Sequence, residues 1–240
     1  MAESASASGG NRPSTYFSNN QIFFPALSAD GQVPVAQFLS ASQGIADFVG
    51  FLGAAFSPIK SDVAGNVAKI RAKYALEPTK FPTIQTLIED DLQENEGKMG
   101  VASEGLLWLK RGLEFFLVLI KLLVEQFEKD RKAESLVNPI RQAYDAALKR
   151  HHGFLSKQLF KLVILAAPYR STLLKAVAFG KEGMEEQCVS DMQLYLPTFE
   201  QNVHVLVKFY LDRSLETPLD PDTSADTCTS AELTQATNSC

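Results

Sequence analysis

Apolar residues recur at steps of three and four over most of the chain, and this spacing predicts one helix after another. The clearest stretch is 101–128, where one apolar stripe comprises Leu106, Leu109, Leu113, Phe116, Ile120 and Leu123. A second set widens the stripe and comprises Trp108, Phe115, Leu119 and Leu122. A helix that is apolar almost all round is typical of a central, buried position.

The same pattern predicts about ten helices, some of them fused to a neighbour. They are expected at 34–42, 44–56, 58–76, 82–95, 101–128, 135–152, 153–165, 170–179, 182–194 and 197–214. Pro58, Pro82 and Pro197 fit the first turn of a helix, whereas Pro168 should end or kink one. No Asn-Gly or Asp-Gly pair joins two alternating strands, so we expect a layered all-α domain.

The two ends of the chain differ in composition from its middle. The start is rich in Ser, Ala, Gly and Asn, and the end is rich in Thr, Ser, Asp and Pro. We therefore expect residues 1–32 and 214–240 to be disordered and a single folded domain to occupy 33–213. The final segment holds five acidic residues and no Lys or Arg, which matches the net charge of −5 of the whole chain. The remaining, nearly neutral part does not favour a nucleic-acid-binding protein.

Compartment and chemistry are constrained by what the sequence lacks. Three cysteines in no metal-binding spacing, and a start without an apolar segment, favour a reduced, cytoplasmic location. The most apolar stretch, 105–124, is interrupted by four charges, which argues against a membrane span. The nucleophile, dinucleotide, phosphate-loop and zinc motifs are missing, so we expect no enzyme, no cofactor and no metal site.

The three histidines also give no reason to expect a metal site or a catalytic site. His151 and His152 are adjacent, so on a helix they would point about 100° apart and could not share one metal ion. His204 follows Glu200 by four residues, which is typical of a pair on a helix surface.

One helical face combines three kinds of polar group. Asp62, Asn66 and Lys69 are spaced so that they fall within about 60° of each other on a helix. A carboxylate, an amide and a cation together suit a polyhydroxylated ligand, which needs both donors and acceptors. The alternative is a solvated helix face with a simple Asp–Lys pair.

Two other residues have a structural and a functional interpretation. Trp108, the only Trp, is either a core residue or a flat platform under a sugar ring. His152 is either a structural or surface histidine or a hydrogen-bonding group at the mouth of an apolar space.

The stretch 149–180 holds six cations and no acidic residue. The cations are Lys149, Arg150, Lys157, Lys161, Arg170 and Lys175. With Phe154 and Tyr169 beside them, they could form a surface attracted to an anionic membrane. The alternative is that acidic partners come from elsewhere in the chain, such as residues 89–96.

Taken together, four stretches resemble the glycolipid transfer protein family, whose members carry glycosphingolipids between membranes. The matching stretches are 57–70 (SPIKSDVAGNVAKI), 107–113 (LWLKRGL), 147–154 (ALKRHHGF) and 166–170 (AAPYR). They follow the order of the family, and the similarity covers about residues 33–213. It implies a two-layer all-α sandwich of about eight helices with an apolar lipid pocket between the layers.

The resemblance also implies roles for individual residues. Asp62, Asn66 and Lys69 would hydrogen-bond the first sugar, and Trp108 would stack under it. Asp62 and His152 would bind the ceramide amide. The excess of Phe suggests an apolar wall around the lipid chains, for which our candidates are Phe48, Ile59, Phe115, Leu119, Leu148 and Phe160. Membrane contact is expected at Phe154, Lys157 and Tyr169, and Phe154 stands where some members have Trp.

The expected ligand is a glucosyl-, galactosyl- or lactosylceramide. The protein is expected to associate transiently and peripherally with a membrane surface. No nucleic-acid partner is expected, and the resemblance allows a weak homodimer. Members that carry ceramide-1-phosphate have cations at the positions of Asn66 and Trp108, so the sugar-binding subclass fits better. The alternatives are a ceramide-1-phosphate carrier and a lipid sensor or scaffold of the same fold.

Overall fold

The computed structural model describes residues 14–217, apart from the side chains of Phe154 and Leu155. In this part of the chain eight α-helices and five short 3-10 helices form, with no β-strand beyond two isolated bridges. The helices are α1 (Val35–Val49), α2 (Ser57–Leu76), α3 (Ile84–Glu94), α4 (Val101–Lys129), α5 (Val137–Ala147), α6 (Phe154–Ile164), α7 (Arg170–Val177) and α8 (Glu185–Asp212). The expected all-α fold is confirmed.

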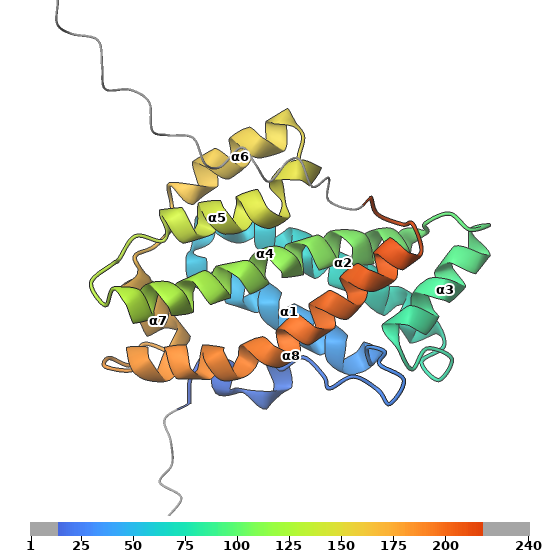
Figure 1. Ribbon diagram of the computed structural model, residues 1–240, viewed down its shortest axis with the longest axis horizontal. Helices are drawn as coiled ribbons and strands as arrows, with labels where there is room; N and C mark the ends of the chain where they lie inside the picture. The colour runs from blue at the N-terminus through green and yellow to red at the C-terminus, as the bar shows by residue number, and fades with distance from the viewer. Residues whose placement is uncertain (1–13, 218–240) are drawn as a thin grey trace, which may run out of the picture.

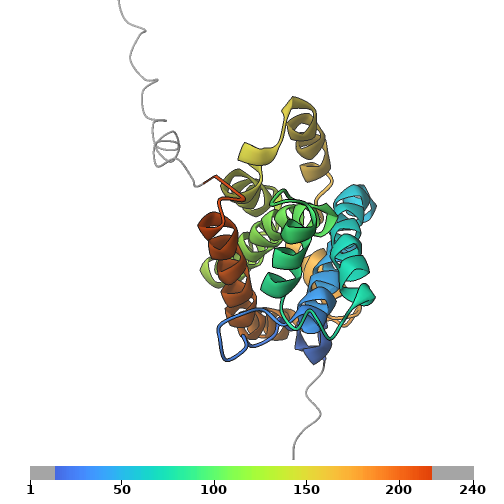
Figure 2. The ribbon, with the colours of Figure 1, turned by 90° about the vertical axis from the view of Figure 1, so that its right-hand side faces the viewer.

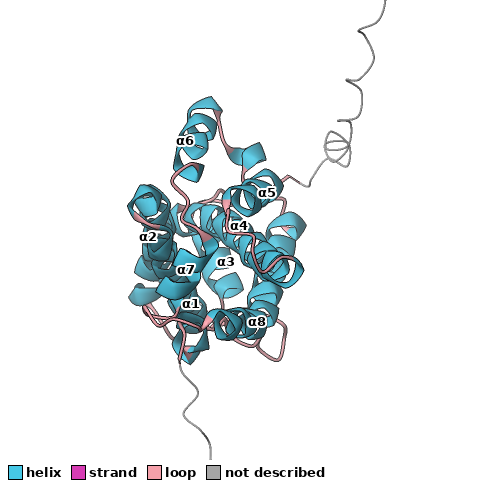
Figure 3. Cartoon of the chain, turned by 90° about the vertical axis from the view of Figure 1, so that its left-hand side faces the viewer, coloured by secondary structure: helices cyan, strands magenta, loops and turns pink. Residues whose placement is uncertain are grey.

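The helices form two layers that meet along α4. Figures 2 and 3 show α1 and α2 on one side and α5 and α8 on the other, with α4 between them. Helix α4 packs against α1, α2, α5 and α8, as its almost fully apolar surface predicted. Between residues 14 and 217, no helix has the length and apolar character that a membrane span requires.

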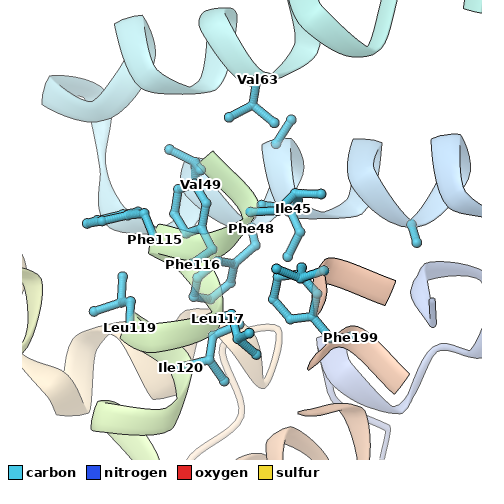
Figure 4. Packing of buried hydrophobic residues seen from close by; sticks show 14 of the residues in the cluster. Ile45, Phe48, Val49, Val63, Phe115, Phe116, Leu117, Leu119, Ile120 and Phe199 are labelled. Carbon is cyan, nitrogen blue, oxygen red and sulfur yellow. The ribbon is translucent and has the colours of Figure 1, made fainter. Parts of the chain in front are cut away.

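Aromatic rings fill the space between the layers. Phe48 of α1 and Phe116 of α4 lie edge to face with ring centroids 6.4 Å apart, and Phe199 of α8 reaches the same region (Figure 4). All three side chains are buried. Such contacts add to the burial of the apolar area itself, which stabilises the fold most.

Two pairs of neighbouring stretches that were expected to be separate helices each form one helix. The stretches expected as 34–42 and 44–56 form α1, which ends at Val49 and is followed by the 3-10 turns Gly50–Leu52 and Ala54–Phe56. The stretches expected as 182–194 and 197–214 form α8.

Proline positions explain part of this difference. Pro58 lies in the first turn of α2, as expected, but Pro197 lies inside α8 and does not begin a helix. An internal proline costs a helix about 3 kcal/mol. The fully buried rings of Tyr195 and Phe199 flank it, so packing keeps both halves of α8 in line. Pro82 precedes the N-cap residue Thr83 and is therefore outside α3.

The expectation of disorder over 1–32 is wrong for residues 14–32. Phe17 and Phe24 are buried, and the Thr15 hydroxyl donates to Asp191 Oδ2 of α8 over 2.7 Å. Asn202 Nδ2, also of α8, donates to the Pro25 carbonyl over 2.8 Å. The polar composition hid these few anchoring residues. The expected disorder of residues 1–13 lies outside the described residues.

The acidic end of the chain also begins in contact with the domain. Glu216 is only 9% exposed, so the expected disordered tail does not start at residue 214. The rest of that tail, residues 218–240, lies outside the described residues.

Candidate functional site

The first part of the site is one face of α2. Asp62, Asn66 and Lys69 lie on it as their spacing predicted. Asn66 is only 3% exposed, whereas Asp62 and Lys69 reach solvent. Lys69 Nζ donates to Asn66 Oδ1 over 3.0 Å, so this hydrogen bond orients the amide. The face is thus not a row of independently solvated side chains.

Helix α4 approaches this face closely because Gly105 has no side chain. A Cβ atom at residue 105 would lie 3.1 Å from Lys69 Cβ and 3.5 Å from the Asn66 carbonyl oxygen. Trp108 follows Gly105 by one turn of α4, so α4 presents it close to the polar face of α2. The ring is 39% exposed, which excludes the interpretation of Trp108 as a core residue.

Arg111 covers part of the Trp108 ring. Its guanidinium carbon lies 4.6 Å from the ring centroid, within the range of a cation–π contact. The stack restricts the orientation of the indole. Sequence reasoning missed Arg111, although its position three residues after Trp108 on a helix would have indicated the contact.

His152 adjoins the same face from the segment after α5. Its Nδ1 lies 3.2 Å from the Tyr144 hydroxyl. Burial lowers the pKa of His152, and Lys157 and Arg111 lower it further, while Asp62 opposes the change. Partial burial raises the pKa of Asp62, with Lys69 and His152 acting against it. These mutual effects place Asp62 near both Lys69 and His152, and the lowered pKa favours a neutral imidazole at pH 7.

A second cluster lies on the other side of Arg111 and joins the end of the chain to α4. Glu216 Oε1 accepts from Arg111 Nε over 2.8 Å, and its Oε2 accepts from Lys110 Nζ over 2.5 Å. Lys110 Nζ also donates to Glu114, over 3.2 Å, and His151 Nε2 lies 3.6 Å from Glu216 Oε1.

This cluster holds its charges in a fixed arrangement. Burial alone would raise the pKa of Glu216, but the hydrogen bonds from Lys110 and Arg111 outweigh it and lower the pKa. No local pattern in the sequence indicates these contacts, because they join residues more than 100 positions apart. Among residues 14–217, no group of three His, Cys, Asp or Glu side chains could hold a metal ion.

Four of the six residues expected to form the apolar wall belong to the buried hydrophobic core. Phe48, Phe115, Leu119 and Phe160 are buried, and three of them are labelled in Figure 4. The rings of Phe115 in α4 and Phe160 in α6 are 6.4 Å apart. The other two candidates, Ile59 and Leu148, are only partly buried and precede Asp62 and His152 by three and four residues. Both side chains pack against the buried core.

Helix α6 carries an exposed apolar surface at one end of the molecule, where it projects beyond α5 (Figures 1 and 3). We call this the α6 surface; its large exposed apolar residues are Leu159, Leu162, Leu165 and Tyr169. The side chain of Phe154, also expected here, lies outside the described residues. Contiguous exposed apolar side chains mark surfaces that interact with something other than water.

The acidic residues near 89–96 do not neutralise the basic stretch 149–180. Asp90 and Glu94 pair with Lys73, and Glu89 pairs with Arg213. Within 149–180, Lys149 and Lys175 pair with Asp145 and Glu182, each within a few residues. Lys157 and Lys161 form no ion pair with any described side chain.

Comparisons with known proteins agree with this architecture. The sequence model of the glycolipid transfer protein (GLTP) family matches residues 33–179 of this chain. A glycolipid transfer protein of Danio rerio is 38% identical over 78% of this chain and 91% of its own length. Glycolipid transfer protein B of Xenopus laevis is 35% identical over the same shares.

Solved structures give the same result. FAPP2, described as selecting simple glycosphingolipids with the GLTP fold, superposes with a TM-score of 0.76. The sequence identity is 27%, and the match covers 85% of this chain and 98% of that one. The fungal glycolipid transfer protein HET-C2 gives a TM-score of 0.69 at 30% identity, covering 81% of this chain and 94% of that one.

Proposed function

The chain belongs to the glycolipid transfer protein family, and on that premise we propose that it is a non-enzymatic carrier of glycosphingolipids between membranes. The observation that supports this most strongly is the assembly of Asp62, Asn66 and Lys69 beside the exposed ring of Trp108. A sugar has hydroxyl groups around its edge and an apolar C–H face. Hydrogen-bonding groups beside a flat aromatic ring complement both.

In the proposed complex, the first sugar rests on Trp108 and its hydroxyl groups bond to the α2 face. Asp62 accepts, Lys69 donates, and the Asn66 amide can do both. Lys69 orients Asn66 through a hydrogen bond, so little freedom of the Asn66 side chain remains to be lost on binding.

The ceramide amide then lies between Asp62 and His152. We assign the Tyr144 hydroxyl as the donor to His152 Nδ1, which lies 3.2 Å away, so that the imidazole carries its proton on Nε2. Nε2–H donates to the amide carbonyl, while Asp62 accepts from the amide N–H. A lowered pKa keeps His152 neutral, so it contributes this hydrogen bond without adding a charge.

The lipid chains enter the apolar interior past Ile59 and Leu148. Moving a chain from bilayer to protein exchanges one apolar environment for another. The transfer term of about 0.8 kcal/mol per CH₂ therefore largely cancels. The residues Phe48, Phe115, Leu119 and Phe160 keep the chains away from water during transit. No covalent step is needed.

Selectivity comes from the head group. A lipid without a sugar leaves Asp62, Asn66 and Lys69 desolvated without partners, at about 1–3 kcal/mol for each group. Plain diacyl lipids are rejected in this way, and glucosyl-, galactosyl- and lactosylceramide are accepted.

Membrane contact occurs through the α6 surface. Its apolar side chains enter the interface, and Lys157 and Lys161 are attracted to anionic lipids at about 1 kcal/mol per cation. The contact is peripheral and reversible, and it brings the mouth of the site to the bilayer.

Transfer of fluorescent glucosylceramide between vesicles tests the proposal. The wild type should transfer it, and Trp108→Ala and Asp62→Asn should each slow transfer at least tenfold. Asp212→Asn is the matched control, because Asp212 forms only an exposed pair with Lys208 on α8. Equal rates for all four proteins would contradict the proposed role of the site, and tight binding without transfer would favour a lipid sensor.

A further inference from the structure

Resting on the proposed function, we propose that Glu216 is a specificity-determining residue. Its carboxylate occupies Lys110 and Arg111 and so prevents the site from accepting a lipid with a phosphate head group. Glu216 lies outside the helices and has no contact with the α2 face. It acts through the two cations that it holds.

The position of Glu216 is fixed by the backbone after α8. Ser214 adopts a left-handed conformation with φ of 54°, which reverses the direction of the chain. The Leu215 N–H donates to the Tyr210 carbonyl over 2.9 Å and closes the turn. The reversal directs the Glu216 side chain onto α4, where it is 3% exposed. A buried carboxylate is therefore held between two cations at the border of the site.

Arg111 connects this carboxylate with the lipid-binding side. Its Nε donates to Glu216, while its guanidinium group covers the Trp108 ring. A guanidinium group is well shaped to bind phosphate through two hydrogen bonds. Glu216 engages the Nε of this group and keeps it over the indole ring, so Arg111 supports the sugar platform and is not available to a phosphate group.

The balance of charges around Glu216 also supports its role in excluding lipids with a phosphate head group. In the cluster around Glu216, two cations, Lys110 and Arg111, pair with two carboxylates, Glu114 and Glu216. Removing the charge of Glu216 leaves one positive charge uncompensated in a largely buried place. A phosphate group on the lipid would then supply the missing negative charge.

The variant Glu216→Gln tests this directly, because Gln keeps the size of the side chain and one acceptor oxygen but removes the negative charge that Lys110 and Arg111 share. The rates of transfer of glucosylceramide and of ceramide-1-phosphate between vesicles are measured for each protein. The ratio of the ceramide-1-phosphate rate to the glucosylceramide rate should be at least tenfold higher for Glu216→Gln than for the wild type. Adding Lys110→Met to Glu216→Gln removes the surplus cation and should return the ratio to the wild-type value. Glu89→Gln is the matched control, since it breaks only the Arg213 pair near the same turn.

A lipid-free measurement separates this inference from the proposed function. Thermal unfolding of each variant is followed by the emission of Trp108, the only Trp, in inorganic phosphate and in chloride of equal ionic strength. Glu216→Gln should gain more stability from phosphate than the wild type, Glu89→Gln and the double variant do. A normal phosphate response of Glu216→Gln, or an unchanged lipid ratio, would overturn the inference. If Glu216→Gln fails to fold, the double variant must fold with wild-type preferences, and any other preference overturns the inference. Failure of wild-type glucosylceramide transfer would overturn the proposed function instead.

Discussion

Two adjacent histidines show how strongly single residues depend on their surroundings. His152 faces Asp62 and Tyr144, whereas His151 faces the cluster of Glu216, Lys110 and Arg111. Burial, Arg111 and Arg150 lower the pKa of His151 from 6.5 to about 4, and the attraction of Glu216 offsets only part of this. In the folded protein, His151 therefore stays neutral at mildly acidic pH, whereas in the unfolded chain it takes up a proton.

This difference predicts a pH-dependent stability. A histidine with a lowered folded-state pKa stabilises the fold fully above pH 6.5, and that contribution is lost as the pH falls toward about 4. Urea unfolding between pH 4 and 8 should show a shallower pH dependence for His151→Gln than for the wild type. Parallel curves would show that His151 is not responsible.

At this scale the sequence predicts some of the site and not the rest. The helical spacing of Asp62, Asn66 and Lys69 was enough to place them on one face. Spacing left Trp108 ambiguous, because exposure depends on a neighbouring helix. Glu216 could not have been found, since its partners are distant in sequence and its surrounding composition indicates disorder.

The crossing of α2 and α4 is the contact between helices that assembles the site. Gly105 lies at its closest point, where a Cβ would be 3.1 Å from Lys69 Cβ. Gly105→Ala should displace Lys69 and slow glucosylceramide transfer several-fold. Crowding of a packed contact costs about 1–3 kcal/mol, so any gain in helix propensity is cancelled.

Gly112, on the same helix, is the natural control for this prediction. The nearest atom to a Cβ at residue 112 is Val63 Cγ2 at 3.9 Å, an ordinary contact. Gly112→Ala should leave transfer unchanged and raise the free energy of unfolding by about 0.5–1 kcal/mol. Equal transfer by the two alanine variants would show that close helix approach is not needed.

The α6 surface gives a prediction for a single helix. Leu162 and Leu165 are 69% and 75% exposed, so Leu162→Gln/Leu165→Gln should barely change the stability of the soluble protein. The same variant should bind anionic vesicles at least tenfold more weakly in a sedimentation assay. Leu194→Gln on α8, whose side chain is 60% exposed, should bind like the wild type. Equal weakening by Leu194→Gln would indicate nonspecific adsorption.

Hydrophobic periodicity recovered nearly every helix but misjudged where helices end. The error at Pro197 arose because packing of Tyr195 and Phe199 outweighs a local breaking signal. The error at residues 14–32 arose because a few buried rings anchor a segment of polar composition. Both errors concern tertiary contacts, which a window along the sequence does not contain.

In the whole molecule, the proposed regions for the lipid chains and for the head group are separate and meet at one edge of the two layers. In the proposed function, the apolar interior between them receives the lipid chains, and α2 and α4 present the polar groups that bind the head group. Helix α6 adjoins both, through the contact of Phe160 with Phe115 and through its exposed surface. In the proposed function, a lipid therefore leaves the bilayer and enters the protein at the same end of the molecule.

Capture of a lipid from a membrane tests this account most directly. The protein is incubated with vesicles holding equal amounts of glucosylceramide, ceramide-1-phosphate and phosphatidylcholine, separated from them, and examined by native mass spectrometry. The account predicts one chemically unchanged glucosylceramide per chain, and none on Trp108→Ala. A protein that emerges empty, or that carries mainly ceramide-1-phosphate or phosphatidylcholine, would contradict it.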